Sequence, residues 1–144
     1  MIAHRLAIVA MTALSLQAAT AAAADTPLDY GFFKARVEPI FLKKREGHVR
    51  CYVCHSEGTN AFKLQHMPHG AKTYTDEQSR KNFEIASNLV VPGQPLKSRL
   101  LLQPLAAEAG GNPYHSGGRQ FASKETAEWK ALAEWVNGAK APVK

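Results

Sequence analysis

The residues best suited to chemistry in this chain lie in the segment "RCYVCHSEG", residues 50–58. It contains the only two cysteines, Cys51 and Cys54, and His55 directly follows the second one. Two thiols at this spacing can add to the two vinyl groups of one haem, and the adjacent imidazole can coordinate the iron. The segment therefore predicts one haem c, attached through thioethers to Cys51 and Cys54, with His55 as the proximal ligand.

Three other uses of the same residues are less favoured. A structural zinc site takes four ligands, and without further cysteines it would need His66 and His69 to complete it. A thioredoxin-like redox pair normally sits in a βαβ setting, and no strand is indicated before the motif. A disulfide between Cys51 and Cys54 would close too short a loop to stabilise a domain much.

The first 24 residues have the pattern of a secretory signal peptide. Arg5 precedes an apolar stretch, and a run of small residues ends at Ala24. The apolar stretch is shorter than the roughly 20 residues of a membrane-spanning helix and is interrupted by polar residues. We therefore expect cleavage near Ala24, one domain over residues 25–144 without a membrane span, and export to the periplasm or beyond.

The charge of the expected mature chain is basic. The full sequence has 18 Lys and Arg residues against 12 Asp and Glu residues, and cleavage removes only Arg5 from these totals. A basic surface favours an acidic partner, so we expect a redox protein with an acidic docking surface. Nucleic acid is not expected as a partner, because export separates the protein from nucleic acid. The sequence also has no stacking platform or groove-reading motif.

The elements that must position the motif are predicted to be helices. Four segments have apolar residues at helical spacing: 29–42, with a bend or break near Pro39; 75–90, capped by Thr75; 99–105, capped by Ser98; and the segment after Ser123, with Glu125 in its first turn and Gly138 at its end. Irregular loops are expected at 57–75 and 109–118. No stretch alternates strictly between apolar and polar residues, so the predicted fold class is all-α.

Several quoted segments occur together in one known family. They are "VEPIF" at 37–41, "CYVCH" at 51–55, "VPGQPLKSRLLL" at 91–102, and "HSGGRQF" at 115–121 followed by a Trp-containing helix. With these segments the chain resembles a c-type cytochrome domain, in particular its planctomycete-type branch, in which counterparts of Pro92–Ser98 and Trp135–Ala139 recur. The resemblance implies a small cytochrome c-like fold whose terminal helices cross beside one haem, with electrons passing through the exposed haem edge.

One segment departs from that family pattern. Many members carry Met-Pro-Pro ahead of the last helix, where the methionine is the sixth iron ligand, but this chain has "NPYHSGG". His48 is too near the motif, which leaves His66, Met67, His69 and His115 as candidates. His115 is favoured because the family takes its distal ligand from the loop before the C-terminal helix. Met67 in "HMPH" and an open sixth position remain alternatives.

Two tryptophans and three arginines each allow two interpretations. Trp129 and Trp135 are expected to pack the helix crossing rather than line the haem crevice. Arg50, Arg99 and Arg119 are each expected at the solvated surface, with pairing to haem propionates as the alternative.

The expected function is electron transfer by an exported monohaem c-type cytochrome, as a carrier or as the electron-transfer subunit of a periplasmic oxidoreductase. The chain is not expected to be an enzyme itself, because no nucleophile with a base, carboxylate pair or phosphate loop is evident. One alternative is a haem-based gas sensor or small peroxidase with an open sixth position. Another is a non-catalytic interaction module with an ordinary disulfide.

Overall fold

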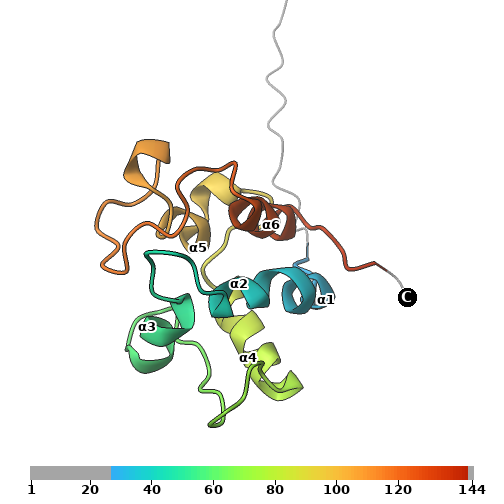
Figure 1. Ribbon diagram of the computed structural model, residues 1–144. Helices are drawn as coiled ribbons and strands as arrows, with labels where there is room; N and C mark the ends of the chain where they lie inside the picture. Colours follow the sequence, from blue (N-terminus) through green and yellow to red (C-terminus); the bar gives the residue numbers. More distant parts are fainter. Residues whose placement is uncertain (1–26, 143–144) are drawn as a thin grey trace, which may run out of the picture.

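The computed structural model describes residues 27–142, and the expected signal peptide lies outside this range. Within these residues the chain is helical, with no strand and only two isolated bridges, Arg45 with His48 and Leu105 with Phe121 (Figure 1). The predicted all-α class is confirmed for the described residues. No helix in the described range is both long and apolar enough to cross a membrane.

The N-terminal helical segment changes its hydrogen-bonding register before Pro39. It consists of α1 (Tyr30–Phe32), a π-helical turn η1 (Phe33–Val37) and α2 (Glu38–Leu42). The Glu38 N–H donates to the Phe33 carbonyl, five residues back. Proline has no N–H to continue a regular ladder, and the wider turn accommodates this interruption. The irregularity predicted near Pro39 is therefore present as a change of register, and the chain stays helical through Pro39.

The remaining helices are short and are joined by long loops. They are α3 (Cys51–Glu57), α4 (Asp76–Ser87), the 3-10 turn η2 (Pro95–Lys97), α5 (Arg99–Leu102), the 3-10 turn η3 (Ala107–Ala109) and α6 (Ala127–Val136). The cap predicted for α4 is confirmed: Thr75 Oγ1 accepts from Gln78 N at 3.2 Å, and Gln78 Oε1 accepts from Thr75 N at 3.0 Å. Such a reciprocal pair satisfies two otherwise free N–H groups.

One predicted helix cap and one predicted helix start differ from the structure. Ser98 lies at the N-cap position of α5, but its hydroxyl accepts from Val91 N and donates to Gln94 O, both at 2.9 Å. It therefore closes the preceding loop instead of capping the helix. The last helix begins only after Thr126, because the Thr126 hydroxyl bonds back to Ser123 O at 3.0 Å in a turn. Glu125 consequently precedes α6.

The core is centred where the N-terminal helical segment crosses α6 (Figure 1). Phe33 and Trp135 are fully buried, with ring centroids 5.3 Å apart, and Phe83 of α4 packs on Phe33 at 5.4 Å. The Trp135 indole N–H donates to Asp29 O at 3.1 Å, so its polar atom is satisfied. Trp129 is also buried, and both tryptophans belong to the core as expected.

A buried carboxylate ties α2 to α4. Glu38 is only 5% exposed, and it accepts hydrogen bonds from Ser79 Oγ at 2.7 Å and Asn82 Nδ2 at 3.1 Å. Asn82 Oδ1 in turn accepts from Gln65 N at 2.9 Å, which fixes the loop before α4. Because a buried carboxylate is costly without partners, these bonds make the α2–α4 contact specific.

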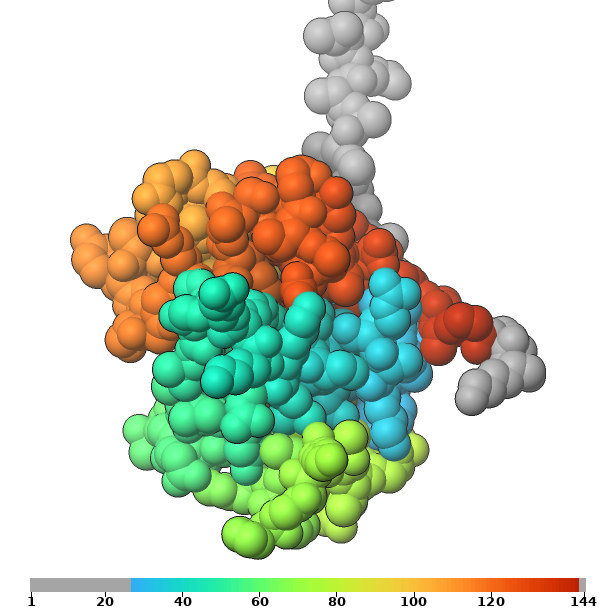
Figure 2. Space-filling model, in the orientation of Figure 1, coloured from blue at the N-terminus to red at the C-terminus, as the bar shows by residue number. Residues whose placement is uncertain are grey.

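A loop over residues 106–120 is closed at its base like an Ω-loop. Ala106 N donates to Phe121 O at 2.9 Å, and Gln120 N donates to Pro104 O at 2.7 Å. Ends that lie this close make a compact surface loop of defined shape. Figures 1 and 2 show this orange segment lying beside the teal segment that leads into α3.

Candidate functional site

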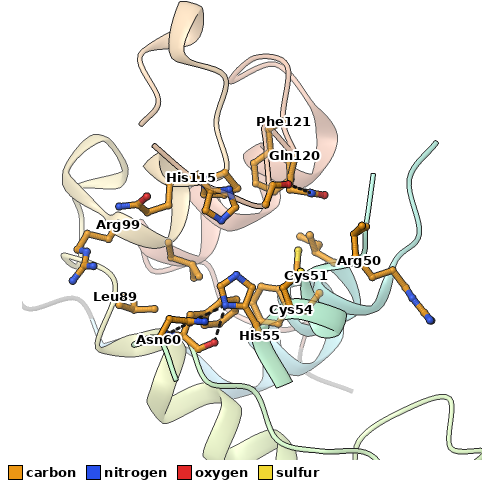
Figure 3. Close-up of a pocket in the computed structure, with 18 of the residues that line it drawn as sticks. Arg50, Cys51, Cys54, His55, Asn60, Leu89, Arg99, His115, Gln120 and Phe121 are labelled. Carbon is orange, nitrogen blue, oxygen red and sulfur yellow. Dashed lines mark hydrogen bonds between the residues drawn. The ribbon is translucent and has the colours of Figure 1, made fainter. Parts of the chain in front are cut away.

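A cavity of about 470 Å³ lies between the start of α3 and the 106–120 loop. This volume is in the range of about 300–1,000 Å³ that is typical of small-molecule and cofactor sites. Its apolar lining comes from α2, α5 and α6, with Ile40, Phe41, Leu100 and Leu132, and from the loop after α3, with Phe62. Cys51, Cys54, His55 and His115 also line it, as Figure 3 shows. Neither Trp129 nor Trp135 is among its lining residues in the described range.

The two thiols occupy the first turn of α3. Cys51 and Cys54 are three residues apart on one helix, so they share a face, and both line the cavity. Both are free thiols in the described structure and are not joined as a disulfide. Burial raises the pKa of Cys51, while the nearby Arg45 guanidinium opposes that rise. Cys54 is exposed, so the two thiols differ in their surroundings.

His55 is oriented by two oxygen atoms at its Nδ1. Asn60 Oδ1 lies 2.9 Å from this nitrogen, and the Phe62 carbonyl oxygen lies 3.0 Å from it. A backbone carbonyl only accepts, so Nδ1 carries the proton and donates. The lone pair of the neutral ring is therefore on Nε2, which is the form in which histidine binds a metal.

His115 is held in the matching form within its loop. Its Nδ1 lies 2.7 Å from the Gly118 carbonyl oxygen, so this nitrogen is also the donor and Nε2 has the lone pair. Gly117 lies directly against the ring, because a Cβ at that position would be 3.1 Å from His115 Cε1. The Gly118 carbonyl thus orients the imidazole, and Gly117 leaves space for it.

The two imidazoles face each other across the cavity. Their ring centroids are 6.2 Å apart and their planes differ by 12°. In Figure 3 a ring nitrogen of each points into the gap. Two metal–nitrogen bonds of about 2 Å, with each nitrogen's offset from its ring centroid, would separate the centroids by about 6 Å. The observed centroid separation therefore has the size expected for a metal ion held between one nitrogen of each ring.

The other sixth-ligand candidates lie outside the cavity lining. The Met67 backbone N–H donates to the Tyr52 hydroxyl at 3.1 Å, and His66 Nδ1 lies 3.5 Å from Glu57 on the exposed surface. Neither these residues nor His69 line the cavity. The structure thus brings His115, and not the 66–69 segment, opposite His55.

The mixed zinc site considered from sequence is not assembled. Over residues 27–142, no group of three or more His, Cys, Asp or Glu side chains is arranged to hold a metal ion. His66 and His69 are both exposed and lie outside the cavity that Cys51 and Cys54 line.

The three candidate arginines are separated by the fold. Arg50 and Arg99 line the cavity and lie on opposite sides of it in Figure 3. Arg119 is outside this cavity and lies 3.5 Å from Glu108 in a surface ion pair. All three side chains are exposed, which confirms the expected surface positions, and only Arg50 and Arg99 are also at the cavity, where an anionic group of a ligand could meet them.

Sequence reasoning did not identify Asn60, Phe62 or Gly117 as site residues. Asn60 and Phe62 follow His55 closely in sequence, but their contact with its ring depends on how the loop after α3 folds back. Gly117 is two residues from His115 in sequence, but its role of leaving room for the ring appears only in the folded loop.

The comparisons give no further guide to the site. Searches against protein-family models, curated proteins and solved structures find no match for this chain. Functional conclusions therefore depend on the residues and the geometry described above.

Proposed function

We propose that this protein is an exported monohaem c-type cytochrome of the planctomycete-type branch that transfers electrons, as a carrier or as the electron-transfer subunit of a periplasmic oxidoreductase. The observation that supports this most directly is the pair of facing imidazoles, with centroids 6.2 Å apart, in a cavity that both cysteines also line. When bound, the haem would supply one-electron exchange at its iron.

Each part of the site has a distinct role in this proposal. Cys51 and Cys54 would hold the cofactor by two thioethers, and His55 and His115 would each offer an imidazole nitrogen to the iron. The apolar lining of the cavity would keep water from the bound group and so influence its reduction potential. Arg50 and Arg99 are available to the propionates, because guanidinium groups pair well with carboxylates.

The experiment that tests this function uses the full chain, exported in a bacterium that attaches haem to c-type cytochromes. We expect the purified protein to retain one haem per chain after denaturation and acid-acetone extraction, and to give a six-coordinate low-spin spectrum. Complete extraction of the colour would refute the proposal. A five-coordinate high-spin haem would instead favour a sensor or peroxidase, and a protein without haem would favour an interaction module.

The exposed residues around the cavity favour an acidic partner protein. Val49 and Arg50 are exposed at the cavity, and Tyr114, beside His115, is 90% exposed. Exposed apolar groups near positive charge suit a transient electron-transfer contact with a negatively charged protein.

Electron transfer to an acidic redox protein should depend on salt. At limiting concentration we expect the second-order rate to fall steeply above about 0.1 M ionic strength, where the screening length is about 10 Å. Replacing Arg50 with Gln should lower the rate at low salt. Lys81→Gln is the control, because Lys81 is paired with Glu77 on α4. A second-order rate that does not change with ionic strength would contradict electrostatic docking.

A further inference from the structure

Asn60 has an unusual position beside the proximal histidine. Its Oδ1 lies 2.9 Å from His55 Nδ1 and also accepts from Phe62 N at 3.0 Å. The side chain reaches this place over Gly58, where a Cβ would come within 2.7 Å of Asn60 Nδ2. Asn60 therefore connects the loop backbone to the imidazole through one oxygen atom.

The orientation of this amide follows from its partners. The Phe62 N–H can only donate, so the amide atom that it meets must be the oxygen and not the nitrogen. The same oxygen faces His55 Nδ1, which therefore donates toward Asn60 as well as toward the Phe62 carbonyl. His55 thus has two acceptors on one N–H.

The opposite ring differs, because its Nδ1 meets a backbone carbonyl and no side-chain acceptor among the hydrogen bonds of the described residues. His115 Nδ1 has one protein acceptor, Gly118 O, at 2.7 Å. Acceptors on the N–H of a metal-binding histidine fix its orientation and raise its basicity at the other nitrogen. Asn60 is therefore a side chain through which the donor strength of His55 can be set separately from that of His115.

We propose that Asn60 is a positioning residue that strengthens His55 as a ligand and so lowers the reduction potential of the bound iron. This inference rests on the proposed function. A more electron-rich ligand stabilises the oxidised iron, which has the higher positive charge, more than the reduced iron. The contribution of Asn60 adds to that of the Phe62 carbonyl, which any residue at position 62 would provide.

The test compares two substitutions with opposite expected effects on the midpoint potential of the haem-loaded protein. Asn60→Leu removes the acceptor, so we expect the midpoint potential to rise. A tenfold fall in the ratio of oxidised to reduced protein at a fixed applied potential corresponds to a rise of ~59 mV in the midpoint potential of a one-electron couple. Asn60→Asp keeps an acceptor in the same place and adds negative charge, so the potential should fall. Asn88→Leu is the matched control, because Asn88 is exposed at the end of α4.

The outcomes separate this inference from the function on which it depends. Covalent haem with a low-spin spectrum in all variants, together with equal potentials or shifts of one sign for both Asn60 substitutions, would overturn the role of Asn60 alone. Failure of the wild-type chain to retain haem would overturn the proposed function and this inference together. Opposite shifts at Asn60 and none at Asn88 would support the inference, because a purely structural role does not predict a change of sign.

Discussion

Replacing both Cys51 and Cys54 with alanine is expected to abolish covalent haem attachment, which is the largest effect that we predict. The two side chains are the only cysteines of the chain and both line the cavity. Without them no thioether can form, so acid-acetone should extract all of the colour. Mass spectrometry of the denatured variant should show the unmodified chain, whereas the wild type should carry the mass of one haem.

Matched variants make this result specific. Each single cysteine variant should retain one thioether, and Val53→Ala should retain both, because Val53 is 43% exposed between the cysteines. The cofactor-free double variant should also lose most of its helical circular dichroism, since a ligand that binds only the folded state stabilises it. Covalent haem in the double variant, or its loss in Val53→Ala, would contradict the assignment.

Replacing His115 with alanine is expected to convert the haem from low spin to high spin and to open it to carbon monoxide. The reason is that His115 provides the imidazole facing His55, and alanine offers no ligand in its place. Absorption spectra of the reduced protein with and without carbon monoxide measure the change. The wild type should also have a lower potential than a Met/His cytochrome and lack the near-red band of an iron–sulfur bond.

Two further variants distinguish His115 from its competitors. Met67→Leu should leave the spectrum unchanged, because Met67 does not line the cavity. Gly117→Ala should shift the ring, since its Cβ would lie 3.1 Å from His115 Cε1, and should give a partly high-spin mixture. An unchanged spectrum in His115→Ala together with a high-spin haem in Met67→Leu would move the sixth ligand to Met67.

Sequence alone was sufficient for the features that depend on neighbouring residues. The α4 cap needs only Thr75 and Gln78, three residues apart, and the end of α6 needs a glycine at positive φ, which Gly138 supplies. The motif is equally local. Cys51, Cys54 and His55 lie within one and a half helical turns, so their chemistry could be proposed before any fold was known.

Local signals were less reliable where a polar side chain had two possible partners. Ser98 has the residue type and position of a cap, yet its hydroxyl bonds to the loop that precedes it. Thr126 delays the start of α6 by bonding back to Ser123. Serine and threonine hydroxyls can satisfy backbone groups on either side, and only the folded loop decides which bond forms.

Only the tertiary structure decided which distant residue meets His55. By residue type His66, His69 and His115 are equal candidates, and the family resemblance, not any local pattern, was what favoured His115. Their positions in space come from contacts between segments: the bond from Gln120 N to Pro104 O closes the loop that holds His115 at the cavity, and the bond from Met67 N to the Tyr52 hydroxyl holds Met67 outside it. The same is true of Glu38, whose burial depends on Ser79 and Asn82 more than forty residues away. Spacing along the chain determines which groups share one helical turn, whereas the packing of distant segments determines which groups face one another across a cavity.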